Sequence, residues 1–301
     1  MDAATFHQQR RYATTASGRV AYVEQGSGPQ ALFVHGVPLN GFHWRHVLDQ
    51  VADLRHCVAL DLLGLGYTEI DSEQDVSFSA QAEMIVQFLD ALGIDQVDLV
   101  GNDSGGAIAQ IVAARFPHRI RTLTLTNCDV HDLWPPQAVL HTLALARAGR
   151  LAGRFRQMLE HPGRARDPRG LGAGYADPSA LTDEAIRVYL EPLVSSAERA
   201  ANMHRYWIAS DPQQTVAVEP LLRRLAVPTQ IVWAMDDIFF AIDLAHWLRD
   251  TIPGVVRLIE APKAKLFFPE DRPEALAGPL RELWTGAYVT SPVRSRGADV
   301  D

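Results

Sequence analysis

The chain has 301 residues, 47% of them hydrophobic and 21% charged, which is the composition of a globular protein. A net charge of −8 argues against a surface that binds nucleic acid or an anionic membrane. The two cysteines, Cys57 and Cys128, lie too far apart to suggest a metal-binding pair. With no apolar leader and no apolar run of membrane-spanning length, we expect a cytoplasmic protein without metal, cofactor, nucleic-acid or membrane partner, whose oligomeric state stays open.

Short apolar runs that end near glycine or proline alternate with segments of helical periodicity along much of the chain. The apolar runs predict strands at residues 19–25, 31–36, 56–61, 96–101, 121–128, 227–235 and 255–261. Apolar spacings of three and four predict helices at residues 78–94, 105–116 and 273–284. This alternation predicts an α/β fold with a mostly parallel sheet and helices on both faces.

The pattern changes between residues 131 and 215, where no buried strand is expected. Residues 137–149 and 181–209 have helical periodicity, and a loop rich in Gly, Pro and Arg joins them. We therefore expect a core of residues 1–130 and 216–301, interrupted by a helical cap of residues 131–215. A polar tail ends the chain.

The expected cap contains seven arginines between residues 147 and 169. Arg147, Arg150 and Arg154 are three and four positions apart, so they share one face of a helix. A solvated face is one interpretation, and recruitment of an acidic substrate or partner is the other.

The sequence VDLVGNDSGGAIAQ, residues 97–110, predicts a tight turn between a strand and a helix. A nucleophile at such a turn needs small residues two positions before and two after it, because larger side chains would collide there. Asp103 has glycine at both places, whereas Ser104 has Asn102 before it. The sterics therefore favour Asp103 as the exposed residue of the turn, with a glycine-rich turn of no catalytic role as the alternative.

Four motifs occur in the order typical of an α/β-hydrolase: HGVP at 35–38, DLLGLG at 61–66, GNDSGG at 101–106 and WAMDD at 233–237. The chain resembles that family from about residue 18 to residue 284. The aspartate in the third motif is similar to the branch of epoxide hydrolases and haloalkane dehalogenases. The resemblance implies that Asp103, ionised at neutral pH, attacks carbon and forms an alkyl-enzyme ester.

The resemblance also implies roles for the residues around this aspartate. The backbone N–H groups of Val37 and Ser104 would form the oxyanion hole used when water cleaves the ester. Asp237 would be the acid of the triad, since Asn127 occupies the other acid position used by some dehalogenases. Dehalogenation is disfavoured, because Ser104 and Val37 stand where that branch holds a halide with tryptophan and asparagine.

The chain departs from the family pattern at the catalytic histidine. Residues 262–273 read PKAKLFFPEDRP, and their flanks match the pattern with Leu266 at the histidine position. A leucine cannot take a proton from water, and loss of a general base slows such a step by about 10²–10⁴-fold. Three interpretations stay open: another histidine substitutes, the chemistry needs no hydrolysis, or the protein binds a ligand without turnover.

Several other side chains are candidates for the pocket. His35 is expected to support its loop, whereas His131 opens the cap and could point over the pocket. Tyr189 and Tyr206 could donate a proton to an epoxide oxygen, with packing between cap and core as the alternative. Trp134 is expected to line the pocket or to pack at the cap entrance.

Two classes of function follow from these residues. One is an epoxide-hydrolase-like enzyme with an incomplete triad that acts on an apolar small molecule. The other is a non-hydrolytic cyclase or lyase, or a ligand-binding protein, on the same fold. A serine esterase using Ser104 is opposed both by the sterics of the turn and by Leu266.

Overall fold

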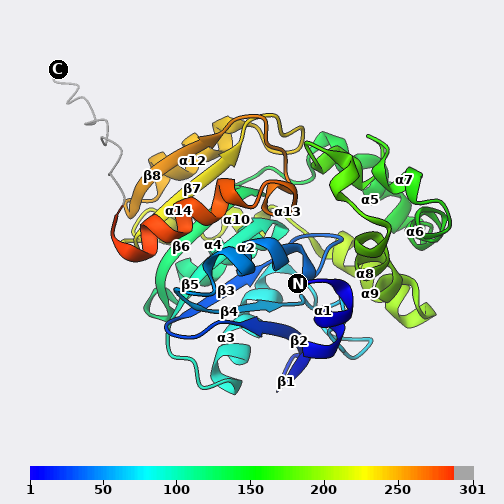
Figure 1. The fold of residues 1–301 in the computed structure, drawn as a ribbon, viewed down its shortest axis with the longest axis horizontal. Helices are drawn as coiled ribbons and strands as arrows, with labels where there is room; N and C mark the ends of the chain where they lie inside the picture. Colours follow the sequence, from blue (N-terminus) through cyan, green and yellow to red (C-terminus); the bar gives the residue numbers. More distant parts are fainter. Residues whose placement is uncertain (288–301) are drawn as a thin grey trace.

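The computed structural model describes residues 1–287 and is built on a central eight-stranded sheet (Figure 1). The strands are β1 (Arg11–Thr15), β2 (Gly18–Gln25), β3 (Gln30–Val34), β4 (His56–Leu60), β5 (Val97–Asp103), β6 (Ile120–Cys128), β7 (Thr229–Ala234) and β8 (Val255–Ala261). Their order in the sheet is β1-β2-β4-β3-β5-β6-β7-β8. The pairs β1–β2 and β2–β4 are antiparallel and the others parallel, so the predicted mostly parallel sheet is confirmed.

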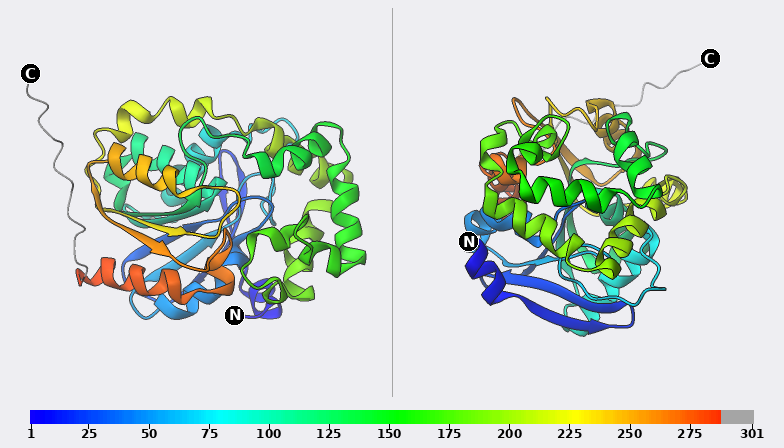
Figure 2. Two further views of the ribbon diagram at one scale, coloured as in Figure 1. Left: turned by 90° about the horizontal axis from the view of Figure 1, so that it is seen from above. Right: turned by 90° about the vertical axis from the view of Figure 1, so that its right-hand side faces the viewer.

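Helices cover both faces of this sheet, as the alternating pattern predicts. The helices outside the β6–β7 connection are α1 (Ala3–Gln9), α2 (Arg45–Val51), α3 (Phe78–Ala91), α4 (Ser104–Arg115), α12 (Ile242–Thr251), α13 (Phe268–Asp271) and α14 (Glu274–Thr285). α2 packs against α14, and α3 packs against α4. Figure 2 shows α14 and α4 on opposite sides of the sheet. The sheet is therefore enclosed, which explains why all side chains of β5 and β7 are buried.

Several core segments were missed by the sequence analysis, among them β1 and α12. β1 is a short, polar edge strand in which Ala13 alone is buried, so it lacks the apolar run used to predict the other strands. α12 buries only Ala245, Leu248 and Thr251, which leaves a weak apolar stripe. β1 pairs with β2, and α12 packs against β7 and β8, so both elements depend on contacts that the local sequence does not show.

The connection between β6 and β7 is helical, and its described residues form no strand. It contains α5 (Leu140–Arg147), α6 (Leu151–Glu160), α7 (Pro162–Arg166), α8 (Asp183–Val194), α9 (Ala197–Ala209), α10 (Gln213–Val216) and α11 (Glu219–Leu222). We call this connection the insertion. Figure 1 shows α5 to α9 grouped beside one end of the sheet.

The insertion differs in detail from the sequence prediction. The helix expected over residues 181–209 is divided into α8 and α9, where the Ser196 hydroxyl accepts a hydrogen bond from the Arg199 N–H at 3.1 Å and begins the second helix. The expected loop before it contains the short helix α7. The polar tail after residue 287 lies outside the described residues. Within residues 1–287, no helix combines the length and apolarity needed to cross a membrane.

Candidate active site

Asp103 ends β5 and directly precedes α4, at the turn where the sequence predicts a nucleophile. Its backbone has φ +56° and ψ −136°, a conformation that costs energy in any residue except glycine. A Cβ atom on Gly105 would lie 2.3 Å from the carbonyl oxygens of Val34 and His35, and one on Gly101 would lie 2.7 Å from the Gly105 oxygen. Both flanking glycines are therefore required by close backbone contacts.

The Asp103 carboxylate is 5% exposed and accepts hydrogen bonds from the backbone N–H groups of Ser104 and Val37. These are the two donors that the sequence assigns to an oxyanion hole. The pKa of Asp103 is raised to about 8, mainly by burial and also by the charge of Asp237, while the two backbone donors oppose the shift. The buried carboxyl is therefore ionised only at mildly basic pH.

The Ser104 side chain is directed away from the pocket that Asp103 lines. Its hydroxyl lies 2.8 Å from the Tyr206 hydroxyl, and both residues are buried. Tyr206 therefore contacts the candidate site through Ser104 and is not among the pocket-lining residues.

Asp237 follows β7, and it has a substitute partner in place of an imidazole. The Asn127 side-chain amide donates to one carboxylate oxygen at 2.9 Å, and the Phe239 N–H donates to the other at 3.0 Å. Burial raises the pKa of Asp237 to about 6, and these donors oppose the shift. Asn127 also binds the Ala234 N–H at 2.6 Å, so it joins the ends of β6 and β7.

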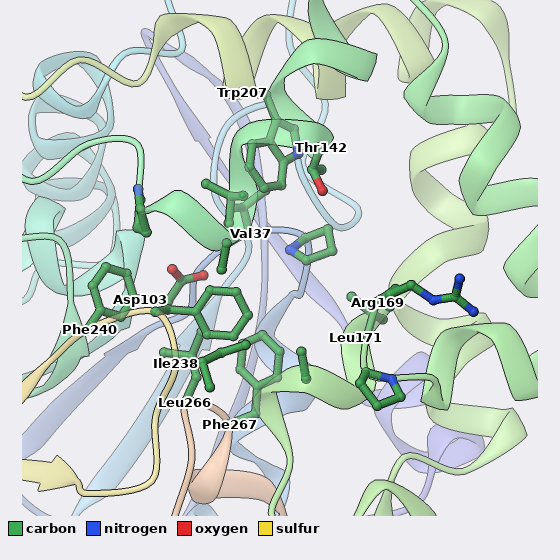
Figure 3. Close-up of a pocket in the computed structure, with 18 of the residues that line it drawn as sticks. Val37, Asp103, Thr142, Arg169, Leu171, Trp207, Ile238, Phe240, Leu266 and Phe267 are labelled. Carbon is green, nitrogen blue, oxygen red and sulfur yellow. The ribbon is translucent and has the colours of Figure 1, made fainter.

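Leu266 is 3% exposed and lines the same pocket as Asp103 (Figure 3). Its carbonyl accepts a hydrogen bond from the Asn102 side-chain amide at 3.0 Å, which ties its loop to β5. An isobutyl group therefore faces the pocket at the position where the resemblance predicts a histidine. Among residues 1–287, no histidine lines this pocket.

The pocket has a volume of about 840 Å³, including its open mouth, and its walls are mostly apolar. Its polar lining side chains are those of Asp103, Thr142, Arg154 and Arg169, and its aromatic lining residues are Trp134, Phe155, Trp207, Phe239, Phe240 and Phe267. The predicted pocket residues Val37, Trp134 and Leu266 line it. The sheet supplies the carboxylate and the insertion supplies much of the opposite wall.

Residues 32–273 match the family described as alpha/beta hydrolase fold. The chain belongs to that family. It is 30% identical over 291 residues to haloalkane dehalogenase 2 of Mycobacterium tuberculosis (strain ATCC 25618 / H37Rv), covering 91% of this chain and 94% of that protein. It is 24% identical over 242 residues to the cis-3-alkyl-4-alkyloxetan-2-one decarboxylase of Shewanella oneidensis, covering 77% of this chain and 74% of that protein. The structure of epoxide hydrolase CorEH without ligand has a TM-score of 0.77 at 17% identity, covering 93% of this chain and 99% of that chain.

Within this family member, the two histidine candidates lie outside the pocket. His35 is buried: its Nδ1 lies 2.8 Å from the Gly36 carbonyl oxygen, and its Nε2 accepts from the Leu62 N–H. Burial lowers the pKa of His35 to about 3, so the ring is neutral and holds two loops together. The possibility that His131 points over the pocket is wrong. Its ring contacts Glu219 at 2.8 Å and Asp132 at 3.2 Å.

Tyr189 does not line the pocket, and of the two interpretations of this residue the packing between cap and core is the one the structure supports. Its hydroxyl donates to Glu270 at 2.8 Å, and the Tyr175 hydroxyl donates to the same carboxylate oxygen at 2.7 Å. Arg45 binds the other oxygen of Glu270 at 2.7 Å. All four residues are buried, and none lines the pocket. This cluster joins the insertion to α2 and α13, so Tyr189 has a structural partner that local sequence does not reveal.

Two residues near the site were missed. Asp129 is 1% exposed and does not itself line the pocket, and apart from its own backbone N–H neither carboxyl oxygen has a hydrogen-bond partner among the described residues. Strand register pairs Asp103 with Cys128, so Asp129 follows at the same edge of the sheet. Burial, and then the charge of Asp103, raise the pKa of Asp129 well above its ordinary value, so this carboxyl is neutral. Trp207 lines the pocket, and its indole N–H has no acceptor in the described chain.

Proposed function

We propose that this α/β-hydrolase-family protein is an epoxide-hydrolase-like enzyme that uses Asp103 as its nucleophile on an apolar small molecule. One observation carries the proposal: a carboxylate at a strained turn faces an apolar pocket while two backbone N–H groups bind it. A carboxylate held in this way is a nucleophile for saturated carbon. Residues 131–215, the part of the insertion expected to form a helical cap, act as the cap over this carboxylate.

Attack forms an ester between Asp103 and the substrate. The carboxylate oxygen bonds to an epoxide carbon, and the carbon–oxygen bond of the ring breaks. The unpaired indole N–H of Trp207 hydrogen-bonds to the epoxide oxygen as negative charge develops there. The ester carbonyl keeps the two donors, Val37 and Ser104, that bind the free carboxylate. The site thus supplies a donor at each oxygen that gains charge.

Asp129 is the proton partner of Asp103 in this mechanism. It is the carboxyl beside Asp103 whose two oxygens accept no hydrogen bond from another described residue, whereas the oxygens of Asp237 are engaged by Asn127 and by backbone N–H groups. Neutral Asp129 gives its proton to the oxygen released from the epoxide. The resulting Asp129 carboxylate takes one proton from the water that attacks the ester carbonyl. The other proton of that water goes to the departing alkoxide, which restores both aspartates and releases a diol.

The test is single-turnover reaction with alkyl and aryl epoxides in water labelled with heavy oxygen. We expect a diol, with the label entering Asp103, because water attacks the ester carbonyl. Asp129→Asn should still form the ester but release it about 10²–10⁴-fold more slowly, so the adduct accumulates in the intact mass spectrum. Asp103→Asn is the control and should form neither adduct nor diol. If Asp129→Asn releases the ester as fast as the wild type, Asp129 is not the proton partner. If Asp103 acquires no labelled oxygen, the reaction does not pass through an ester on Asp103.

A second candidate is decarboxylation of a β-lactone, and the leucine at position 266 favours it. A relative of this chain is named an oxetan-2-one decarboxylase. Asp103 would attack the saturated ring carbon that is bonded to the ring oxygen. Cleavage of that carbon–oxygen bond frees a carboxylate. Loss of carbon dioxide from that carboxylate would then form the carbon–carbon double bond and expel Asp103. No water and no base take part, so the absence of an imidazole would not slow this reaction.

A cis-3,4-dialkyl oxetan-2-one distinguishes the two reactions. Alkene and carbon dioxide without incorporation of labelled water would favour the second candidate. Diol from epoxides would favour the first. Haloalkanes provide a third arm, because a relative is named a dehalogenase. Rapid halide release would show that Trp207 alone replaces the halide-binding residues missing at positions 37 and 104.

A further inference from the structure

The mouth of the pocket opens into a second, larger groove formed by the insertion. The two cavities share lining residues, among them Thr142, Arg154 and Arg169. Five of the seven arginines in this region line the groove: Arg150, Arg154, Arg156, Arg164 and Arg169. The outer end of the pocket is therefore cationic, in a chain whose net charge is −8.

Most of this positive charge is not neutralised by the protein. Within the described residues, Arg169 alone among the five has a carboxylate partner, Asp167, at 2.9 Å, and the Arg169 side chain is 90% exposed, so the unpaired charge at the pocket is mainly that of Arg154. Asp167 is also the one acidic side chain that lines the groove. Arg154 is partly buried, and burial together with the neighbouring Arg169 charge lowers the pKa of Arg154. Crowding like charges beside a cavity is unfavourable, and a bound anion relieves it.

Arg169 and the carboxylate of Asp103 lie on different sides of the pocket (Figure 3). Figure 3 shows Asp103 beside Phe240 and Leu266, and Arg169 across the cavity near Leu171. The walls between them are apolar and aromatic. A molecule that fills this space meets Asp103 at one end, apolar side chains along its body and guanidinium groups at the other end.

We infer that the pocket binds an amphipathic monoanion, with a carboxylate head at Arg154 and Arg169 and an apolar body directed toward Asp103. The planar guanidinium fork matches the geometry of a carboxylate. The inference deepens the proposed function, on which it rests only for the statement that an electrophilic carbon of the ligand reaches Asp103. Binding itself needs no chemistry at Asp103, and it can be measured separately.

The experiment compares ligands of equal length and different head groups. Sodium octanoate, octan-1-ol and octyl phosphate are titrated into the full chain by calorimetry, at low salt and in about 0.5 M sodium chloride. The variants are Arg154→Gln, Arg169→Gln and the double substitution. Arg147→Gln is the matched control, because Arg147 is an exposed arginine of α5 that lines neither cavity.

We expect octanoate to bind about tenfold more tightly than octan-1-ol at low salt, and high salt to remove most of that difference. The double variant should lose the preference without weakening octan-1-ol, and Arg147→Gln should keep it. Equal binding of octanoate and octan-1-ol to the unmodified protein would overturn the inference, as would an equal loss of both ligands in the double variant. Binding of octyl phosphate without octanoate would refute a carboxylate head.

If none of the three ligands binds, the inferred anion site is wrong, whether or not the proposed function is correct. The proposed function would still be tested by adduct formation between Asp103 and small uncharged epoxides. Conversely, a strong preference for octanoate together with no adduct from any electrophile would support the anion site and refute the nucleophile. The two failures are therefore distinguishable.

Discussion

Leu266→His tests whether the site lacks only a base. Leu266 lines the pocket with Asp103 and is 3% exposed, so an imidazole at this position replaces a buried side chain of similar size. Burial disfavours the charged form of histidine, and the ring would therefore be neutral and able to accept a proton at neutral pH. We expect the substitution to accelerate hydrolysis of the Asp103 ester.

The size of the gain is limited by Asp237. A general base contributes about 10²–10⁴-fold when it is correctly oriented. The Asp237 oxygens already accept hydrogen bonds from the Asn127 amide at 2.9 Å and the Phe239 N–H at 3.0 Å. The new imidazole must compete for this carboxylate, so we expect a gain near the lower end, about 10²-fold. A buried imidazole N–H without a partner should also reduce stability by about 1–3 kcal/mol.

The assay follows decay of the ester by intact mass spectrometry after a brief reaction with an epoxide. Leu266→Gln is the matched control, because its side chain is polar without being a base. Both substitutions at position 266 are best compared in a protein that also carries Asp129→Asn. In that protein the proposed proton partner is absent, so the ester should persist unless the new imidazole acts as a base. If Leu266→His and Leu266→Gln release the ester equally slowly in that background while remaining folded, the site has not kept the geometry for water attack and the reasoning is wrong.

Four further predictions concern two buried carboxyl groups, Glu270 and Asp103. Glu270→Gln leaves the Arg45 charge unpaired and should lower the free energy of unfolding by about 3–5 kcal/mol in urea denaturation; a loss below about 1 kcal/mol would contradict the buried pair. The pKa of Glu270 is lowered to about 2, so wild-type stability should fall as the pH drops from about 4.5 toward 2. Burial raises the pKa of Asp103 to about 8, so its alkylation rate should rise about tenfold per pH unit below 8 and level off above it. Asp103→Asn should raise the melting temperature, and this increase should grow from about pH 4 to pH 8. An alkylation rate that does not change with pH, or an increase in melting temperature that does not depend on pH, would contradict the shifted pKa of Asp103.

The parts of the site that the sequence predicts are those set by local sterics. The turn at Asp103 follows from two glycines that no larger residue can replace without meeting backbone oxygens. The strands follow from apolar runs, because a strand buried on both faces needs apolar residues along its whole length. Positions of this kind depend on neighbours a few residues away, and the sequence displays them directly.

The side chains whose roles the sequence left open depend on partners far along the chain. Tyr189 binds Glu270, 81 residues later, and His131 binds Glu219, 88 residues later. No periodicity links such pairs, so the sequence could not choose between the pocket and a structural contact. Asp129 was missed for the same reason, since its closeness to Asp103 comes from the register of β5 and β6.

Leu266 stands where the resemblance predicts a histidine, and the acid that the resemblance predicts has other partners. Asn127 and backbone N–H groups engage both oxygens of Asp237, so Asp237 has a structural role at the end of β7. The turn at Asp103 and its two donors keep the geometry that attack on carbon requires. Under the proposed function, water activation therefore cannot use position 266 or Asp237, whereas attack by Asp103 can use its two backbone donors. A reaction suited to this chain therefore either moves its proton through another buried carboxyl, for which Asp129 is placed, or proceeds from the alkyl ester without water.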